Sequence, residues 1–295
     1  MISFRDASYT YSIKTPFEKL AVKNVSFDLN EGEIVGIIGH TGSGKSTLIQ
    51  MMDALLLPTS GEVYINCTSV QDKKANLKQL RANIGMVFQY PEVQIFEETI
   101  FDEVAFGPKN QGISGEELEQ RVSSACAVVG LNSGDYKKSP LALSGGQKRK
   151  VAIASVLSMK PKVLILDEPT AGLDPRARNS LLKFLKEYNK KFGVSIVMVS
   201  HSMEEIAEIA DRVLVLNKGE IVMDDATNNV FARREFLKSV GLDIPEISTM
   251  MNMLGVTDCW TVSDAILRLK SSMTVANGKR AEVVDAKEGG VGSGV

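Results

Sequence analysis

The sequence predicts an α/β fold in which helices cover a mainly parallel β-sheet. Two observations support this prediction. Short apolar runs alternate along the chain with longer segments whose apolar residues recur at helical spacing, and such alternation is typical of parallel sheets. Several runs are also continuous rather than alternating, as expected of strands that are buried on both faces.

The first ninety residues contain strand patterns and one helix pattern. Apolar and polar residues alternate at 2–4 and 25–29, which predicts half-buried strands. The runs Ile34–Ile38 and Ile84–Phe88 predict buried strands. Between these two runs, apolar residues recur at helical spacing from Leu48 to Leu55.

Helical patterns dominate from about residue 91 to 160, with helices expected at Glu116–Val129 and Gln147–Met159. Strands then alternate with helices again. The strands are expected at Val163–Leu166, Ser195–Val199, Arg212–Leu216 and Ile221–Met223, and the helices at Arg176–Phe192 and Met203–Ile209. The middle block therefore reads as a helical subdomain inserted into a sheet domain.

We expect residues 1–230 to form one domain, with a sheet core at 1–89 and 161–230 and the helical subdomain at about 90–160. Residues 231–295 show short helical segments without chemical motifs, which predicts a helical C-terminal extension. The glycine-rich stretch 286–295 at its end is expected to be disordered.

Composition excludes several classes of protein. The 295 residues are 44% hydrophobic and 24% charged, which is the balance of a folded globular protein. A net charge of −2 gives no reason to expect nucleic-acid binding. The three cysteines are far apart and odd in number, so a reducing compartment is expected. No signal peptide and no apolar run of ~20 residues is seen, so we expect a cytosolic protein or one held on a membrane by partners.

A phosphate-binding loop follows the first buried strand and precedes a helix. Its nine residues match the pattern GxxxxGK[ST] and are Gly39, His40, Thr41, Gly42, Ser43, Gly44, Lys45, Ser46 and Thr47. Glycines let backbone N–H groups curl around phosphates, and the helix directs its positive dipole end at the same anion. We expect Lys45 to reach the β- and γ-phosphates of ATP and the Ser46 hydroxyl to bind Mg²⁺.

Two carboxylates end the strand Val163–Leu166. Asp167 and Glu168 follow an apolar run, and open α/β sheets place ligand-binding groups at the carboxyl ends of their strands. Asp167 is expected to hold Mg²⁺. Glu168 is expected to act as the general base that polarises the attacking water.

A second candidate anion site opens the helix at 147–159. Ser144, Gly145, Gly146 and Gln147 form a Ser-Gly-Gly-Gln run at a helix N-terminus, where backbone N–H groups and the dipole favour anions. A chain with two phosphate sites but one Lys-containing loop is explained if the second site faces another subunit.

These motifs in this order resemble an ABC ATPase over residues 1–230. The stretches GHTGSGKST, VFQ, LSGGQ, LILDEPTAGLD and VSH all occur, and LSGGQ is specific to that superfamily. The resemblance implies a P-loop NTPase fold with a RecA-like core, an antiparallel β part near the N-terminus and an inserted α-helical subdomain. It implies ATP and Mg²⁺ as cofactors.

The resemblance also implies roles for further residues. Tyr11 resembles the aromatic that stacks on adenine, with Tyr9 as the alternative. Gln89 resembles the residue that senses the γ-phosphate, helps to bind Mg²⁺ and contacts the membrane partner. Asp174 ends a loop that joins the two sites across a dimer. His201 resembles the switch histidine at the γ-phosphate and the attacking water, whereas His40, although it lies in the phosphate loop, is expected to be structural.

Among ABC ATPases, a transporter subunit is favoured. Translation factors carry two ATPase domains, and DNA-repair relatives carry long coiled coils or zinc modules; neither pattern occurs here. The segments 90–108 and 147–157 resemble the ATPases of energy-coupling factor transporters, which import vitamins and transition-metal ions, and the whole resembles the second, A-prime, ATPase of the pair. The alternatives are a homodimeric cobalt or nickel importer ATPase and a soluble ABC ATPase without a transport role.

The same resemblance implies the partners. They are a second, homologous ATPase (a heterodimer, with a homodimer possible), a transmembrane scaffold and a separate membrane substrate-binding protein, which place the chain on the cytoplasmic face of the cell membrane. The transported substrate is not encoded in this chain.

Two apolar segments are candidates for contact with those partners. Tyr90–Phe106 places seven large apolar residues among five acids, and we expect it to dock on the scaffold, with core packing as the alternative. Met250, Met251, Met253 and Leu254 either form a dimer contact or pack on the chain's own core.

Overall fold

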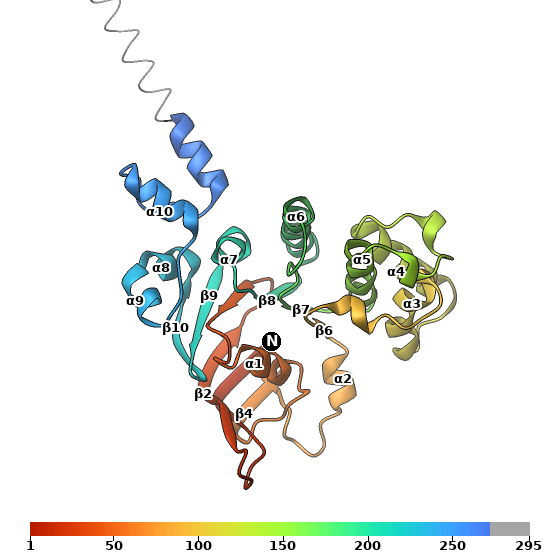
Figure 1. Ribbon diagram of the computed structural model, residues 1–295. Helices are drawn as coiled ribbons and strands as arrows, with labels where there is room; N and C mark the ends of the chain where they lie inside the picture. The colour runs from red at the N-terminus through yellow and green to blue at the C-terminus, as the bar shows by residue number, and fades with distance from the viewer. Residues whose placement is uncertain (272–295) are drawn as a thin grey trace, which may run out of the picture.

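The computed structural model describes residues 1–271 and confirms the α/β class (Figure 1). Its larger sheet has six strands, of which five are parallel and β10 is antiparallel to β9. In spatial order they are β10 (Glu220–Ala226), β9 (Arg212–Asn217), β3 (Ile34–Ile38), β8 (Ser195–Val199), β7 (Val163–Asp167) and β6 (Ile84–Val87).

The predicted strands of this sheet are confirmed. Ile34–Ile38 and Ser195–Val199 have the predicted bounds, and the strand predicted at Ile221–Met223 is longer because all of 220–226 pairs with β9. The middle strands are buried on both faces, which explains their continuous apolar sequences.

A second sheet of four strands is antiparallel, in the order β2 (Lys19–Leu29), β1 (Ile2–Tyr11), β4 (Ser60–Ile65), β5 (Thr68–Ser69). Helix α1 (Lys45–Met52) packs its apolar side chains in one cluster with this sheet and with one face of the larger sheet. It ends before the predicted Leu55 because Ala54 has a left-handed backbone, with φ +51°.

Helices cover the opposite face of the larger sheet. The connection from β6 to β7 contains η1 (Pro91–Gln94), α3 (Ile100–Asn110), α4 (Gly115–Val128), η2 (Ser133–Asp135), η3 (Pro140–Ala142) and α5 (Gly145–Leu157), and it forms a helical block beyond β6 (Figure 1). The short α2 (Leu77–Arg81) precedes β6. The helices of the second half are α6 (Pro175–Phe192) and α7 (Met203–Ile209).

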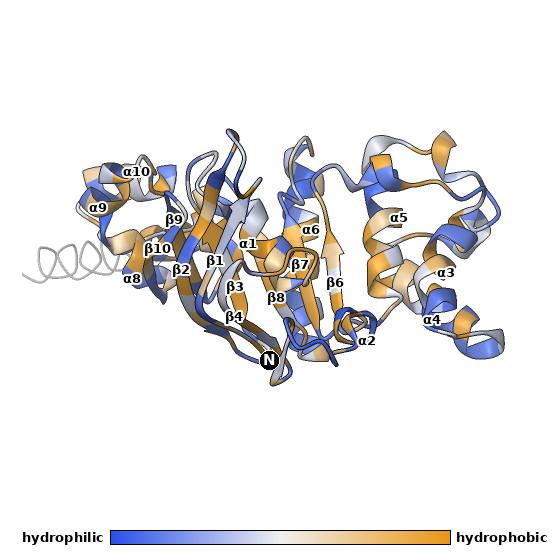
Figure 2. Ribbon diagram, turned by 90° about the horizontal axis from the view of Figure 1, so that it is seen from below, coloured by the Kyte–Doolittle hydropathy of each residue, from blue (hydrophilic) through white to orange (hydrophobic). Residues whose placement is uncertain are grey.

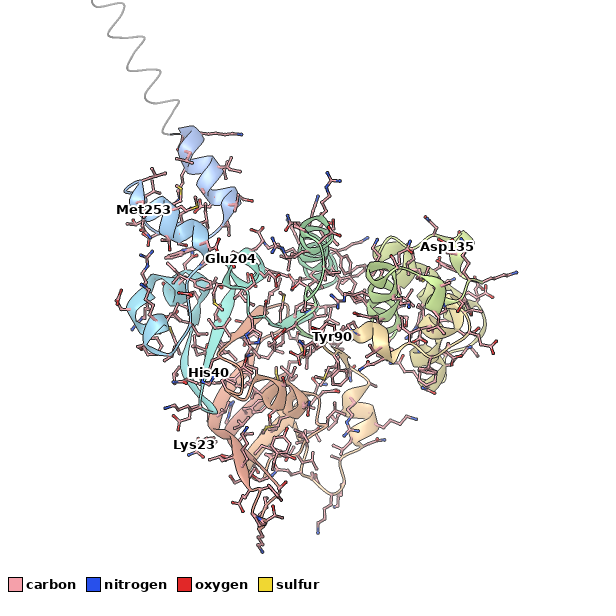
Figure 3. All side chains as sticks on the ribbon, in the orientation of Figure 1. Lys23, His40, Tyr90, Asp135, Glu204 and Met253 are labelled. Carbon is pink, nitrogen blue, oxygen red and sulfur yellow. The ribbon has the colours of Figure 1, made fainter. Side chains whose placement is uncertain are left out.

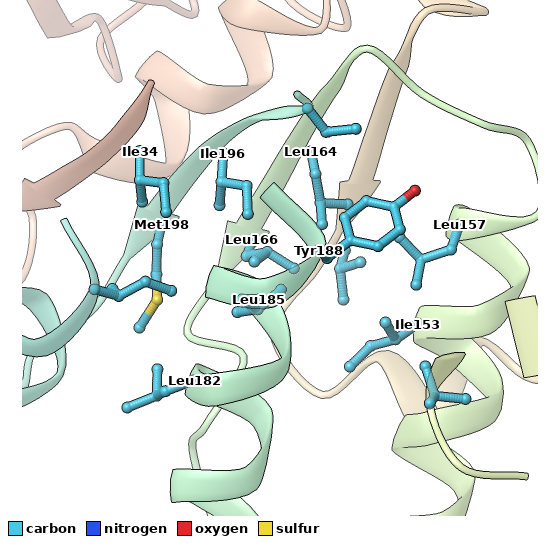
Figure 4. Packing of buried hydrophobic residues seen from close by; sticks show 14 of the residues in the cluster. Ile34, Ile153, Leu157, Leu164, Leu166, Leu182, Leu185, Tyr188, Ile196 and Met198 are labelled. Carbon is cyan, nitrogen blue, oxygen red and sulfur yellow. The ribbon is translucent and has the colours of Figure 1, made fainter. Parts of the chain in front are cut away.

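The core on this face joins three elements. Figure 4 shows Leu185 and Tyr188 of α6 over Leu164 of β7, with Ile153 and Leu157 of α5 beside them. Hydropathy follows the same plan, with apolar residues gathered along the strands and polar residues on the outer loops (Figure 2). Burying these aliphatic side chains contributes about 1.5–3 kcal/mol each.

After β10 the chain forms α8 (Thr227–Ala232), which crosses the expected domain boundary at residue 230, and then α9 (Arg234–Ser239), α10 (Glu246–Met253) and helical residues 262–271. Met251 is buried with Cys259 and Ala265, whereas Met250, Met253 and Leu254 are exposed. The predicted apolar face is therefore divided between core and surface. The stretch 286–295, expected to be disordered, lies outside the described residues. Within residues 1–271, no helix is long and apolar enough to cross a bilayer.

The candidate docking segment is divided in the same way. Ile95, Ile100 and Val104 are buried in the core, and Phe101 packs against it. The other three apolar residues predicted for this contact are exposed: Val93, Phe96 and Phe106. The segment is thus divided between core and surface, because Ile95 and the inward face of α3 pack in the same apolar cluster as α4 and α5, and only the exposed residues remain candidates for the docking contact.

Asp53, at the end of α1, is an acid buried without adequate compensation. It is 8% exposed, its Oδ1 has no hydrogen-bond partner among the described residues, and burial raises its pKa from the usual 3.8 to about 7. The positive charge of Arg81 acts in the opposite direction but is the smaller effect.

Asp53→Asn should therefore change how stability depends on pH. The folded protein holds this proton more tightly than the unfolded chain, so the stability that Asp53 contributes falls as pH rises from about 4 to about 7. Urea unfolding at pH 5 and pH 8 should show a free-energy difference between variant and wild type that shifts in the variant's favour at pH 8, by on the order of a few kcal/mol. An equal difference at both pH values would contradict the assignment.

Candidate functional site

The predicted site residues meet where four neighbouring strands end. The strands β3, β8, β7 and β6 lie side by side and parallel, so their carboxyl ends share one edge of the sheet. The phosphate loop leaves β3, His201 follows β8, Asp167 and Glu168 end β7, and Gln89 follows β6. Residues up to 162 positions apart in sequence are thus brought together by strand order alone.

The phosphate loop has the tight backbone that its glycines permit. A Cβ on Gly44, where φ is +108°, would lie 2.5 Å from the carbonyl oxygen of Ala21, and one on Gly39 would lie 2.4 Å from that of Leu216. Any side chain at either position would therefore displace the loop. The Ser43 hydroxyl is buried and has no hydrogen-bond partner among the described residues. A buried polar group without a protein partner is expected where a bound ligand supplies the hydrogen bond.

Lys45 lies at the centre of the loop with its side chain buried. Its Nζ donates hydrogen bonds to the carbonyl oxygens of Gly39, at 2.7 Å, and His40, at 3.1 Å. Burial lowers the pKa of Lys45, and the carboxylates of Glu168 and Asp167 partly oppose this effect. The ammonium group of Lys45 is thus held inside the loop, close to the carboxylates of Glu168 and Asp167.

Asp167 shares this environment. Burial raises its pKa, and the neighbouring negative charge of Glu168 raises it further, whereas a hydrogen bond from Ser46 and the charge of Lys45 lower it. Two of the three residues predicted to hold Mg²⁺, Ser46 and Asp167, are therefore already in contact, whereas the third, Gln89, bonds to Glu168.

Glu168 lies between the two other residues predicted to act in hydrolysis. Its Oε1 lies 2.8 Å from Nε2 of His201, and its Oε2 accepts a hydrogen bond of 3.1 Å from Nε2 of Gln89. The backbone of Glu168 is left-handed, with φ +49°, and its N–H donates to the carbonyl oxygen of Val199. Such a conformation costs of order 1–3 kcal/mol and occurs where a side chain must be held in one direction.

Two aromatic residues flank the loop on its other side. The hydroxyl of Tyr11 lies 3.1 Å from Oγ1 of Thr47, and its ring meets that of Tyr9 edge to face at 4.8 Å. Tyr11, predicted to stack on adenine, is partly exposed beside the loop. His40 bonds to Thr41 O and to Oδ1 of Asn217, which fits the structural role expected of it.

The remaining predicted residues lie apart from this cluster. Ser144 caps α5, and Gly145, Gly146 and Gln147 are exposed with it; among residues 1–271 no hydrogen bond joins them to the phosphate loop. Asp174 caps α6 by accepting hydrogen bonds from two backbone N–H groups of its first turn.

Arg149 is a residue that the sequence analysis missed. It is 4% exposed, donates to the carbonyl oxygens of Pro169 and Ala171, and forms an ion pair with Glu92 at 3.2 Å. It thus joins the helix that starts at Ser144 to the loop after Glu168. The sequence shows Arg149 two residues after Gln147. A charged residue in a helical pattern is, however, normally expected on the protein surface.

A second missed group is a buried polar cluster of Thr170, Ser200 and Glu205. Ser200 directly precedes His201 and Thr170 lies two residues after Glu168, but none of the three residues carries a signal of its own in the sequence. Hydroxyls and acids near motifs are common on protein surfaces, so only the tertiary contacts reveal this cluster.

Comparison with known proteins identifies close relatives. The ABC transporter family profile matches residues 22–171. The energy-coupling factor transporter ATP-binding protein EcfA2 of Clostridium perfringens is 50% identical over 254 residues, which cover 86% of this chain and 89% of the relative. The EcfA2 of Symbiobacterium thermophilum is 44% identical over 277 residues, covering 94% and 96%.

Two solved structures have the same fold. The cbiO1 protein of Clostridium perfringens, part of the ABC transporter complex cbiONQ, matches with a TM-score of 0.72 and 35% identity over 85% of this chain and 98% of that one. The ATP-binding cassette MJ0796, solved as a dimer bound to ADP and Pi, matches with a TM-score of 0.69 and 31% identity over 77% and 99%.

Arg149→Met should destabilise the fold. The variant leaves Glu92 without its partner and removes the donor to two carbonyl oxygens, and breaking a buried pair in this way costs about 3 kcal/mol or more. Lys183→Met is the matched control, since Lys183 pairs with Glu187 on an exposed helix face, where such pairs contribute about 0.5 kcal/mol. Chemical unfolding measures both; equal effects would contradict the structural weight given to Arg149.

Proposed function

The chain belongs to the ABC transporter family, among the ATP-binding proteins of energy-coupling factor transporters, and we propose that it hydrolyses ATP to drive uptake of a vitamin or another micronutrient. The observation that carries the proposal is the convergence of Lys45, Asp167, Glu168, His201 and Gln89 at one sheet edge. Relatives named as energy-coupling factor transporter ATP-binding proteins reach 50% identity, whereas cbiO1 of the cbiONQ complex is 35% identical, so the energy-coupling factor assignment is favoured over the alternatives.

In this proposal the phosphate loop binds the triphosphate of ATP. Lys45 releases its two carbonyl acceptors and turns to the β- and γ-phosphates, where its point charge replaces neutral hydrogen bonds with charge-assisted ones. Tyr11 stacks on adenine, with Thr47 fixing its hydroxyl. His40 through Ser43 supply the turn of backbone N–H groups.

The residues at the loop also fit Mg²⁺. Ser46 offers a hydroxyl, Asp167 a carboxylate and Gln89 an amide oxygen, the hard ligands that this ion prefers. No cluster of three or more His, Cys, Asp or Glu side chains in the described chain could hold a metal alone. The phosphates of ATP would supply the other ligands of the ion, and the bound ion would neutralise their charge.

Hydrolysis is assigned to the group around Glu168. Its carboxylate accepts the proton of the attacking water as general base. His201, 2.8 Å away, orients that carboxylate and contacts the γ-phosphate, and Gln89 reports the state of the site to the docking segment. The backbone of Glu168 is left-handed, and its side chain contacts both His201 and Gln89 from this position.

We further propose that the chain works as one half of a dimer with a homologous ATPase. The exposed run Ser144–Gln147 would complete the phosphate site of that partner, and Asp174 would lie at the seam between the two sites. Met250, Met253 and Leu254 of the extension, residues 231–295, offer an exposed apolar surface to the same partner. The ATPase domain is assigned to residues 1–230.

Docking on the transmembrane scaffold is assigned to the exposed part of the segment 90–106. Val93, Phe96 and Phe106 are solvent-exposed, and the rings of Phe96 and Phe106 meet edge to face at 4.9 Å. The buried carboxylate of Glu103 accepts the backbone N–H of Phe96, which fixes this surface. A groove of about 910 Å³ runs beside Phe106 between α2 and α3 and can receive a scaffold segment.

The proposed partners would hold the chain at the cytoplasmic face of the membrane, and a separate membrane protein would bind the transported substrate.

Glu168→Gln should abolish hydrolysis and retain ATP binding. The amide keeps the shape of the side chain but cannot act as base, and loss of a general base costs ~10²–10⁴-fold in rate. In a mixed dimer the matching glutamate of the partner is changed as well, so that its site does not mask the loss. Phosphate release and nucleotide binding by the purified complex measure the two effects; wild-type turnover of the doubly changed complex would show that the assignment is wrong.

Phe96→Asp should release the transmembrane scaffold without unfolding the chain, because Phe96 is 61% exposed. Ile95→Asp, at the buried neighbour, should instead unfold it. Phe192→Asp, at an exposed phenylalanine at the end of α6, is the control for added charge. Circular dichroism, ATP binding and co-purification of the scaffold are compared; a transport-competent complex with Phe96→Asp would remove this surface from the docking site.

A further inference from the structure

We propose that Glu205 is a positioning residue for ATP hydrolysis, whose buried carboxylate fixes the loop that carries Glu168 against the loop that carries His201. This inference rests on the proposed function, because it assigns Glu205 a role through those two residues. Among residues 1–271, the hydrogen bonds of Glu205 are made to Thr170, Ser200 and Ser202, and none joins it to Glu168, to His201 or to the phosphate loop.

The contacts are direct. Oε2 of Glu205 accepts a hydrogen bond of 2.6 Å from the hydroxyl of Thr170 and one of 2.8 Å from the hydroxyl of Ser200. Thr170 lies two residues after Glu168, and Ser200 immediately precedes His201. A single oxygen atom therefore ties together the two loops whose side chains meet 2.8 Å apart in the site.

All three side chains are withdrawn from solvent, with exposed fractions of 5% for Glu205, 7% for Thr170 and 4% for Ser200. Burying an acid is costly unless it is well hydrogen-bonded, and an apolar residue would fill the same volume at lower cost. Hydrogen bonds to an ionised acceptor are shorter and stronger than neutral ones, and the 2.6 Å distance fits that class. The cost is explained if the carboxylate serves to hold its two donors.

The hydroxyl of Ser200 is fixed in direction as well. It accepts a hydrogen bond from the backbone N–H of Ser202 at 3.0 Å, so its proton is free to point at Glu205. Ser202 in turn caps α7, where its hydroxyl accepts the N–H of Glu205 at 3.3 Å. These hydrogen bonds, from the N–H of Ser202 to Ser200 and from the N–H of Glu205 to Ser202, hold the turn that contains His201 against helix α7.

Helix α7 is itself anchored to the strand that leads into the phosphate loop. Gly36 of β3 has no side chain, and a Cβ there would lie 2.7 Å from Cγ2 of Ile206, so the helix packs directly on the strand. The neighbouring Glu204, labelled in Figure 3, lies on α7. Its carboxylate accepts the backbone N–H of Glu246 at 2.9 Å, which links α7 to the C-terminal extension. Glu205 therefore projects from a fixed support.

This arrangement predicts an effect on the chemical step alone. Within residues 1–271, no hydrogen bond joins the phosphate loop or Tyr11 to the cluster, so ATP binding should survive its loss. Glu168 and His201 would lose their fixed spacing, and misplacement of catalytic groups by about 1 Å can cost 10²-fold in rate. The signature of a positioning role is thus a fall in kcat at nearly constant KM.

The test uses the assembled transporter complex, with the partner ATPase inactivated at its own general base. Thr170→Val removes one donor at nearly constant shape and should lower kcat for ATP roughly tenfold to a hundredfold, with KM changed by less than about threefold. Thr170→Ser keeps the hydroxyl and should restore most of the rate. Glu208→Gln, on the same helix but in an exposed pair with Lys186, is the matched control and should leave both constants unchanged.

A second measurement separates positioning from simple loss of stability. In a Glu168→Gln background, Thr170→Val should lower the residual rate no further, because it acts through Glu168. The inference is overturned if Thr170→Val keeps the wild-type kcat, if Thr170→Ser fails to rescue, or if the two changes multiply. Failure of the proposed function has a different signature, since Glu168→Gln would then keep wild-type turnover whatever is placed at Thr170.

Discussion

The site depends on the parallel pairing of β3, β8, β7 and β6. Register fixes this pairing, with Val35 opposite Val197 and Leu164 opposite Ile196, and burial on both faces prevents any strand from slipping without exposing apolar side chains. Parallel strands end at one edge, so the groups that follow them must meet there. This constraint brings the phosphate loop, the two carboxylates, His201 and Gln89 together at that edge.

The loop after Glu168 is the part of the site that the sheet alone does not hold. Arg149 of the helical block donates hydrogen bonds to the carbonyl oxygens of Pro169 and Ala171 in this loop. Glu205 of α7 accepts a hydrogen bond from the hydroxyl of Thr170. Since Arg149 also pairs with Glu92 in the proposed docking segment, a displacement of that segment would be passed to the loop. The helical block and the catalytic loop are therefore mechanically joined.

These contacts are costly to stability. Lys45, Asp53, Arg149 and Glu205 are charged groups with little exposure, and Glu168 keeps a left-handed backbone. The two aliphatic clusters on either side of the large sheet offset that cost. Where the compensation is incomplete, as at Asp53, the pKa moves toward 7. Three of the buried charges, Lys45, Arg149 and Glu205, hold the phosphate loop or the loop after Glu168, where fixed direction matters more than stability.

The sequence by itself determined the α/β class, the buried strands such as Ile34–Ile38 and the residues of the phosphate loop. These features are local: continuous apolar runs, glycines that permit a tight loop and a Lys-Ser pair at a helix start are visible within a few residues. Only the tertiary structure decided that Ile95 is buried while Phe96 is exposed, that Met251 is core while Met253 is surface, and that Arg149 and Glu205 lie inside. The reason is that burial of a single side chain is set by which other elements pack against it, and those elements are distant in sequence.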